Sequence, residues 1–270
     1  MDDRPIGVFD SGLGVLTTVR ELCRLLPEED IVYFGDTGRV PYGSRSRETI
    51  VKYARQDVAF LRTFDLKTIV IACGTVSTTA LDVLAAENPI PVLGVVAPAA
   101  RAAARATRSG SIGLIGTQAS IRSGAYERLI RAENPAARVL AQPCPLFVPL
   151  VENGRFRPGD VVIETVAAEY LAPLKAAGVD TLVLGCTHYP LLEKVIGAYM
   201  GPEVRLINSG AEGARAAADC LRERDALAGP GRGSCRCFVS DRQEDFSRLA
   251  STFLGWDVAQ AVEQVDISQY

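Results

Sequence analysis

The sequence is poor in histidine and tryptophan, with one of each among its 270 residues. A single histidine and the absence of a Cys-x-x-Cys pair argue against a zinc-type site, because such sites use clusters of cysteine and histidine at short spacing. The spacing Cys235-x-Cys237 places two thiols on one face of a strand. We interpret this pair as ordinary packing rather than as a metal or redox site.

Long apolar runs and a surplus of positive charge are also missing. No run approaches the roughly 18 residues of a membrane span, and the opening MDDRPIGVFD lacks the basic-then-apolar order of a signal peptide. We therefore expect a cytoplasmic protein with no membrane partner. The net charge of −3 argues against a nucleic-acid partner, because phosphate binding requires an excess of lysine and arginine.

Cysteine is present seven times, at positions 23, 73, 144, 186, 220, 235 and 237. The odd number, the irregular spacing and the lack of an export signal argue against a disulfide framework, so we expect free thiols. The hydrophobic content of 48% allows a large core, in one big domain or in two modest ones.

Short apolar runs alternate with longer segments of helical period, which is typical of a parallel α/β fold with helices on both faces of each sheet. Helical segments are expected over residues 96–110 and 208–228, and the sequence GPGRGS predicts a sharp loop before the last strand. The expected strands span residues 6–9, 31–33, 68–72, 91–95, 112–115, 139–141, 181–184, 204–207 and 235–240.

The two halves of the chain contain pairs of similar segments at similar spacing, and we call this the internal echo. PIGVFDSGLG from Pro5 is answered by SIGLIGTQAS from Ser111, 106 positions later. LKTIVIACGTVSTTAL around Cys73 is answered by VDTLVLGCTHYPLL around Cys186, 113 positions later. Any two strand–helix units share some likeness, but we favour an internal duplication that gives two comparable α/β halves.

Polar loops follow several of the expected strands, where ligands bind in open parallel α/β sheets. The loops begin with Asp10-Ser11-Gly12, Gly35-Asp36-Thr37, Cys73-Gly74-Thr75 and Cys186-Thr187-His188.

Two thiols on equivalent loops suit a reaction that removes a proton from one face of a carbon centre and returns one to the other. Either cysteine alone would more often be a small buried hydrophobe. The matched positions of Cys73 and Cys186 favour catalysis, with Asp10 and His188 tuning or relaying protons beside them. On local evidence, Asp10 and Ser11 suit a helix N-cap equally well.

Four ordered motifs carry a resemblance to a known family: DSGLG from Asp10, GDTGRVPYGSRS from Gly35, ACGTVS from Ala72 and LGCTHYPLL from Leu184. With these motifs the chain resembles the glutamate racemases of the aspartate/glutamate racemase superfamily, from about Ile6 to Ser240.

The resemblance implies roles for individual residues. Cys73 and Cys186 would each act as the acid/base for one enantiomer, and Glu152 would be an acidic residue near the thiols. The residues implied to bind the substrate are Asp10, Ser11, Tyr42, Gly43, Gly74, Thr75, Thr187 and His188.

The resemblance also implies two pseudosymmetric α/β domains with the active site in the cleft between them. The first would comprise residues 1–97 and 208–270, because the C-terminal tail returns to it, and the second residues 98–207. The substrate would be glutamate, racemised without pyridoxal phosphate, metal or other cofactor. The enzyme would be a bacterial cytoplasmic homodimer that supplies D-glutamate for peptidoglycan, and hence for the cell wall and cell shape.

The chain departs from the family pattern at two positions. Family members usually have Cys-Asn-Thr at the first cysteine, whereas Gly74 keeps only the backbone N–H. Loss of one such hydrogen bond costs roughly 0.5–1.5 kcal/mol, unless a water or a neighbour such as Ser77 replaces the amide. Val15 replaces a second glycine after DSGLG, where we expect only a local packing effect.

Three alternatives stay open. An aspartate racemase or a related enzyme would tend to have Thr-Glu after the second cysteine, whereas Thr187-His188 favours glutamate. A binding protein that has lost turnover is compatible with Gly74, although the intact thiols and their neighbours argue against it. A dinucleotide-binding module requires the full Gly-x-Gly-x-x-Gly order, which the glycines after the first expected strand do not provide.

Overall fold

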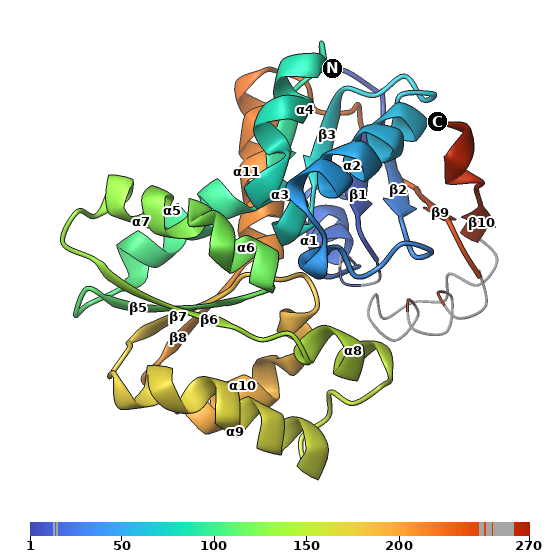
Figure 1. The fold of residues 1–270 in the computed structure, drawn as a ribbon. Coiled ribbons are helices and arrows are strands. Elements are labelled where there is room, and N and C mark those ends of the chain that lie inside the picture. The colour runs from blue at the N-terminus through green and yellow to red at the C-terminus, as the bar shows by residue number, and fades with distance from the viewer. Residues whose placement is uncertain (13, 15, 243–245, 247–249, 251–261) are drawn as a thin grey trace.

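Two parallel sheets, each flanked by helices, organise the described part of the chain in the computed structural model (Figure 1). The structure describes residues 1–12, 14, 16–242, 246, 250 and 262–270. This arrangement confirms the expected α/β fold class with two pseudosymmetric halves.

The first sheet has the strand order β10-β9-β2-β1-β3-β4. All residues of β1, β2 and β3 are buried, as expected for apolar strands covered on both faces. The strands are β1 (Ile6–Asp10), β2 (Ile31–Gly35), β3 (Thr68–Ile71), β4 (Val92–Gly94), β9 (Cys235–Val239) and β10 (Val262–Gln264).

The second sheet has the order β6-β5-β7-β8, so it repeats the order β2-β1-β3-β4 of the first. Its strands are β5 (Ser111–Gly116), β6 (Arg138–Pro143), β7 (Thr181–Leu184) and β8 (Arg205–Asn208). The internal echo of the sequence therefore corresponds to a repeated topology. In that repeat, β3 and β7, which precede Cys73 and Cys186, occupy equivalent places.

The helices lie on both sides of the two sheets. Side chains cap the N-termini of several helices. At the start of α2 the side chain of Ser46 accepts a hydrogen bond from the backbone N–H of Thr49, and at the start of α6 the side chain of Thr117 accepts one from the backbone N–H of Ser120. The helices are α1 (Leu16–Leu25), α2 (Arg47–Leu61), α3 (Gly74–Thr79), α4 (Leu81–Glu87), α5 (Val96–Ala106), α6 (Gln118–Ser123), α7 (Ala125–Glu133), α8 (Phe147–Glu152), α9 (Val161–Ala176), α10 (Glu193–Met200) and α11 (Ser209–Glu223). Short 3₁₀ turns are η2 (Tyr42–Ser44), η3 (Tyr189–Leu192) and η4 (Ile267–Gln269).

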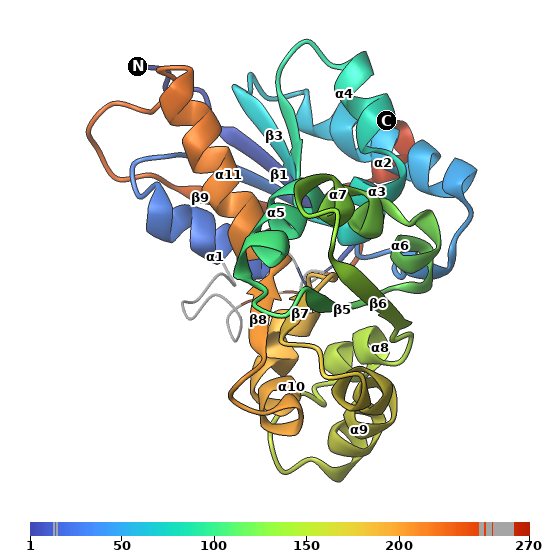
Figure 2. The same ribbon diagram turned by 90° about the vertical axis from the view of Figure 1, so that its left-hand side faces the viewer.

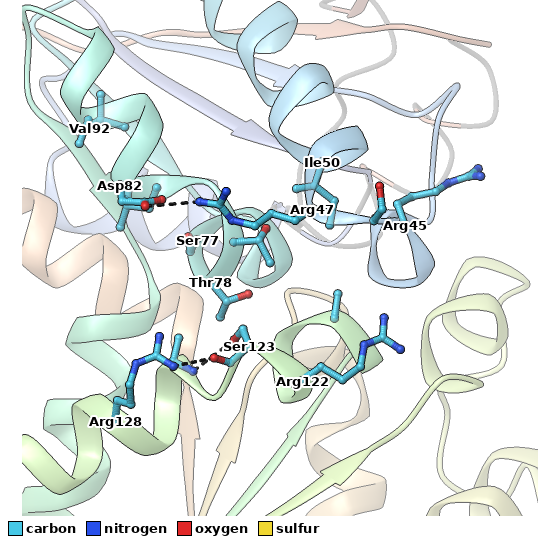
Figure 3. A pocket seen from close by; sticks show the side chains of 16 residues that line it. Arg45, Arg47, Ile50, Ser77, Thr78, Asp82, Val92, Arg122, Ser123 and Arg128 are labelled. Carbon is cyan, nitrogen blue, oxygen red and sulfur yellow. Dashed lines mark hydrogen bonds and ion pairs between the residues drawn. The ribbon is translucent and has the colours of Figure 1, made fainter.

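Helices α5 and α11 join the two halves. Helix α11 packs on α1 of the first half and on α5, and α5 also packs on α7 and β7 of the second (Figure 2). Elsewhere a groove of about 820 Å³ is lined by α2, α3 and α4 on one side and by α6 and α7 on the other (Figure 3). None of the helices in the described ranges is long and apolar enough to cross a membrane.

The nine expected strands all form, with ends within two residues of the prediction. The short strand β10 was not predicted, because two of its three residues are exposed and it lacks an apolar run. The helices expected over residues 96–110 and 208–228 end earlier, at Ala106 and Glu223. The tail, which the sequence alone left unassigned, pairs β9 with β2 and so joins the first sheet. The domain boundaries at residues 97 and 208 stay a prediction.

Candidate active site

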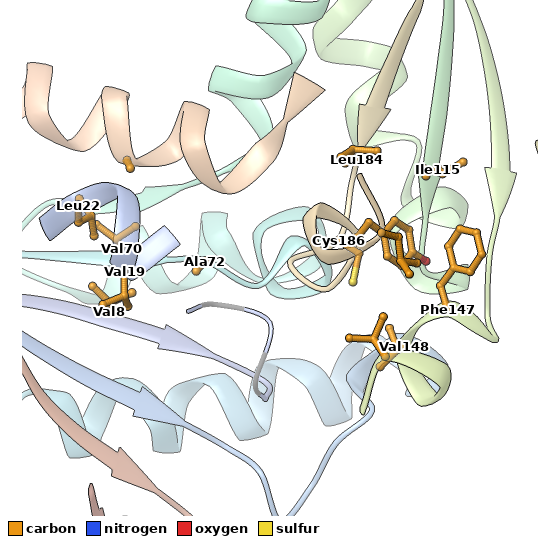
Figure 4. Close-up of a cluster of buried hydrophobic side chains, with 14 of the residues drawn as sticks. Val8, Val19, Leu22, Val70, Ala72, Ile115, Phe147, Val148, Leu184 and Cys186 are labelled. Atoms are coloured by element: carbon orange, nitrogen blue, oxygen red, sulfur yellow. The ribbon is translucent and has the colours of Figure 1, made fainter. Parts of the chain in front are cut away.

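The two cysteines follow equivalent strands and line one cavity. Cys73 lies two residues after β3 and Cys186 two residues after β7. Both thiols are buried, and both border a cavity of about 20 Å³. One water needs roughly 10–15 Å³, so this space is smaller than an amino acid. Behind it, a buried apolar cluster extends from Val8 in the first sheet to Cys186 in the second half (Figure 4).

Cys73 lies beside a hydroxyl and a carboxyl group. The Oγ atom of Ser11 is 3.3 Å from its Sγ atom. Burial raises the pKa of the Cys73 thiol well above its usual value, and the negative charge of Asp10 adds to the increase, while the Ser11 contact opposes it. At neutral pH Cys73 is therefore a protonated thiol.

Asp10 ends β1 and is fully buried. Its Oδ2 atom accepts a hydrogen bond of 3.1 Å from Thr187, which links the two halves. Burial raises the pKa of Asp10, against the opposing effects of His188 and Cys73. In the described residues Asp10 ends β1, and α1 begins at Leu16; the N-cap interpretation of Asp10 and Ser11 stays a prediction.

Cys186 lies beside a charged histidine. The Nδ1 atom of His188 is 3.8 Å from the Sγ atom of Cys186, and its Nε2 atom is 3.1 Å from Oε1 of Glu152, the last residue of α8. Burial disfavours the charged ring, but these contacts with Cys186 and Glu152 outweigh it and raise the pKa of His188 to about 10. An imidazolium therefore faces the Cys186 sulfur at neutral pH.

The predicted Tyr42 and Gly43 lie in the turn η2, which borders the cavity. The Tyr42 hydroxyl is buried and donates to the carboxylates of Asp36 and Asp57, the latter at 3.0 Å. A Cβ atom on Gly43 would lie 2.6 Å from the Cβ atom of Thr117, so only glycine fits this approach between the two halves. The Tyr42 hydroxyl is thus engaged by two carboxylates of the first half.

Gly74 and Thr75 meet residues of the second half across the cavity. A Cβ atom on Gly74 would lie 2.5 Å from the carbonyl oxygen of Gly185. The hydroxyl oxygens of Thr75 and Thr117 are 3.0 Å apart. The start of α3 therefore contacts the residues after β5 and after β7, and Gly74 permits the close approach to the latter.

Thr117 lines the cavity and was missed by the sequence analysis. The sequence did indicate Thr117 as a site residue, because it lies 106 positions after Ser11, which is the offset of the internal echo. The apolar residues Val40, Pro41 and Val148 also line the cavity and were not predicted as site residues, because their side chains carry no polar or reactive group; the first two lie within the motif that begins at Gly35.

The other five cysteines lie outside this cavity. All seven are free thiols, and the Sγ atoms of Cys235 and Cys237 are 3.9 Å apart on β9. Within the described ranges, no group of three or more histidine, cysteine, aspartate or glutamate side chains is arranged to hold a metal ion.

Comparison with known proteins gives the same family from both sequence and structure. The family model for Asp/Glu/hydantoin racemases matches residues 6–217. A glutamate racemase from Geobacter metallireducens is 48% identical over 253 residues, which cover 93% of each chain. A structure of a glutamate racemase isoform from Bacillus anthracis has a TM-score of 0.93 and 38% identity over 98% of each chain. The chain belongs to the glutamate racemases.

The relatives also include a structure with a bound amino acid. A glutamate racemase from Francisella tularensis, solved in complex with D-glutamate, is 37% identical over the whole of both chains, with a TM-score of 0.92. The resemblance seen in the four sequence motifs is thus confirmed at the level of family and fold.

The structure describes one of the two positions at which the chain departs from the glutamate racemase pattern. Gly74 lies against the backbone of Gly185, as described above. Ser77 was considered as a substitute for the missing amide, but its hydroxyl is buried and donates to the carbonyl of Ile71 at 2.9 Å. Val15 lies outside the described residues.

Proposed function

We propose that this chain interconverts L-glutamate and D-glutamate, with Cys73 and Cys186 as the two proton-transferring groups. The observation that carries the proposal is that the two thiols follow equivalent strands of the two sheets and border one cavity. A glutamate substrate is supported by the names of the relatives, one of them solved with D-glutamate. The resemblance further implies that no pyridoxal phosphate or metal takes part.

The proposed reaction uses the thiols in opposite protonation states. Cys186, as the thiolate beside the His188 imidazolium, removes the proton from the α-carbon. The carbanion is then protonated on its other face by the Cys73 thiol. After one turnover Cys186 carries the proton and Cys73 is the thiolate, so the same site converts the other enantiomer in reverse. Glu152 holds the His188 ring in place.

The substrate contacts are assigned from the residues around the cavity. The carboxylate of Asp10 would bind the ammonium group, and the hydroxyls of Ser11, Thr75 and Thr187 would bind the carboxylates. Backbone N–H groups of Gly43 and Gly74 are further donors, and Tyr42 and His188 flank the site. Because the cavity holds about one water, we expect the two halves to separate for glutamate to bind.

The wider setting follows from the resemblance. We place the enzyme in the bacterial cytoplasm as a homodimer that supplies D-glutamate for peptidoglycan synthesis, with domains of residues 1–97 plus 208–270 and 98–207. The bacterial sources of the relatives support a bacterial enzyme.

The test is circular dichroism of L-glutamate and D-glutamate, each incubated with the purified, dialysed protein without added cofactor. We expect the glutamate signal to decay to zero from either enantiomer. Both aspartate enantiomers are run alongside, and decay of the aspartate signal alone would reject the substrate while keeping the thiol pair. No decay of either amino acid would favour a binding protein that has lost turnover.

A further inference from the structure

The described residues of the DSGLG segment, which begins at the last residue of β1, lie against the surroundings of both thiols. On the side of the first thiol, the Oγ atom of Ser11 is 3.3 Å from the Sγ atom of Cys73. On the side of the second, a Cβ atom on Gly14 would lie 2.7 Å from the backbone N and the Nδ1 atom of His188, so the Gly14 backbone packs directly on that residue. The placement of this one segment therefore affects the environment of both proton-transferring groups.

A buried tyrosine of β2 contacts the middle of this segment. The Tyr33 hydroxyl donates to the carbonyl of Gly12 at 3.0 Å. The ring is fully buried and stacks on the ring of Phe246, with 5.6 Å between the centroids. Burial and the negative charge of Asp10 raise the pKa of Tyr33 well above its usual range. The hydroxyl therefore keeps its proton and remains a donor at neutral pH.

The absence of a side chain at Gly35 makes room for this contact. Gly35 pairs with Asp10 across the sheet, and it lies two residues after Tyr33, on the same face of β2. A Cβ atom at Gly35 would collide with the Tyr33 hydroxyl. The glycine that opens the GDTGRVPYGSRS motif thus leaves the space through which the tyrosine reaches the carbonyl of Gly12.

Hydrogen bonds to the backbone restrain a segment that is rich in glycine. Glycine allows the backbone more conformations than other residues do, and Gly12 and Gly14 are both buried in this segment. Two hydroxyls donate to it, that of Tyr33 to Gly12 and that of Thr17 on α1 to the carbonyl of Gly14 at 3.1 Å. The bond from Tyr33 is the one next to Ser11, so its loss would free the part of the segment that lies beside the first thiol.

We propose that Tyr33 is a positioning residue for the proposed two-thiol reaction, on which this role rests. Its hydroxyl fixes the carbonyl of Gly12, and thereby holds Ser11 and Gly14 against the surroundings of the two thiols. Tyr33 is not among the residues that line the cavity, so it acts only through the DSGLG segment. A displacement of roughly 1 Å in an active site can lower the rate by about 100-fold.

The first test compares the kinetics of Tyr33→Phe with those of the wild type, followed by circular dichroism from each glutamate enantiomer. We expect kcat to fall at least about tenfold from either side, because the proton-transferring groups are less firmly placed. The matched control is Tyr170→Phe, which removes the same atom from a ring on α9 that packs on Phe147 outside the cavity. The control should stay within about threefold of the wild type, and a kcat of Tyr33→Phe within that range would overturn the proposal.

The second test needs no turnover. His188 is the only histidine of the chain, so NMR spectra of protein isotope-labelled in histidine report on this ring alone. A displaced Gly14 should shift the ring signals of His188 in Tyr33→Phe but not in Tyr170→Phe. A loss of stability alone would lower the midpoint of urea unfolding without moving these signals, and unmoved signals would overturn the proposal. If the wild type did not racemise glutamate, the proposed function would fail, and the His188 signals would still decide whether Tyr33 holds the segment.

Discussion

At the scale of single residues, the two thiols have opposite surroundings although their strands are equivalent. Cys73 lies beside Ser11 and the carboxyl group of Asp10, whereas Cys186 faces the ring of His188. The first environment keeps a proton on the Cys73 sulfur, and the second places a cationic ring beside the Cys186 sulfur. These different surroundings suit the proposed reaction, in which one sulfur donates a proton and the other accepts one.

Replacing either thiol by alanine tests this pair. Cys73→Ala and Cys186→Ala should each lower the rate of glutamate inversion by about 10²–10⁴-fold, because each removes one of the two proton-transfer groups. The rate is followed by circular dichroism, with far-ultraviolet spectra to check folding. Cys220→Ala, which lies on α11 outside the cavity, should keep the wild-type rate. Full inversion by either single-thiol variant would rule out the mechanism.

The charge on His188 predicts a pH dependence of stability. The pKa of His188 is raised from 6.5 to about 10 in the folded protein, so the folded state holds this proton more tightly than the unfolded state. Its contribution to stability is therefore complete below pH 6.5 and is lost as the pH rises through about 10. Urea unfolding should show the difference between wild type and His188→Asn shrinking over this window. A difference independent of pH would mean that His188 is neutral.

At the scale of elements, a buried polar network fixes the turn η2. Arg39 donates to Asp36 at 2.6 Å and to Asp57 on α2 at 2.9 Å, and the Tyr42 hydroxyl lies between the same two carboxylates. Burial and the charge of Asp36 raise the pKa of Asp57 well above its usual range. Ser240, just after β9, donates to Asp36 at 2.8 Å. Helix α2 and the C-terminal part of the chain thus hold a turn that borders the cavity.

Removing one oxygen atom tests that network. Tyr42→Phe should lower the free energy of unfolding by roughly 1–3 kcal/mol, because it removes one of the hydrogen-bond donors to two buried carboxylates. It should also raise the KM for glutamate, since the turn is less firmly placed. Tyr53→Phe removes the same atom from the neighbouring half-buried ring, 5.5 Å away between centroids, and should change stability little. Equal effects of the two variants in urea unfolding would contradict the proposed positioning role.

At the scale of the whole molecule, the two halves meet through a few close contacts at the candidate site. Thr187 donates to Asp10, the Thr75 and Thr117 hydroxyls are in hydrogen-bond contact, and Gly74 lies against Gly185. These contacts close the cavity, and the last of them depends on the absence of a side chain.

The substitution Gly74→Ala therefore tests the close contact between the two halves. Its Cβ atom would lie 2.5 Å from a backbone oxygen that has little freedom to move. We expect a loss of roughly 1–3 kcal/mol in the free energy of unfolding, measured in urea. Gly197→Ala on α10 is the control, because its Cβ atom would lie 3.8 Å from the side chain of Leu206, at ordinary van der Waals distance. If both variants kept wild-type stability, the two loops would not be held in this contact.

Local sequence determined the strands and the chemistry-bearing loops. The apolar runs that became β1, β3 and β7 are buried on both faces, so their boundaries followed from composition alone. The internal echo matched a repeated strand order, because the same strand–helix units pack in the same way. Thr117 could have been predicted as a site residue from the offset of that echo, whereas the apolar side chains of Val40 and Val148 carry no polar or reactive group that would indicate a site.

Other properties were decided only by the tertiary structure. The raised pKa of His188 depends on Glu152, which is 36 positions away in the sequence and approaches only through packing of α8. The role of Gly74 depends on its distance to Gly185 in the other half, which no local pattern encodes. The sequence determined which groups exist and which element bears them, and their distances, burial and charge states were decided by contacts between the two halves.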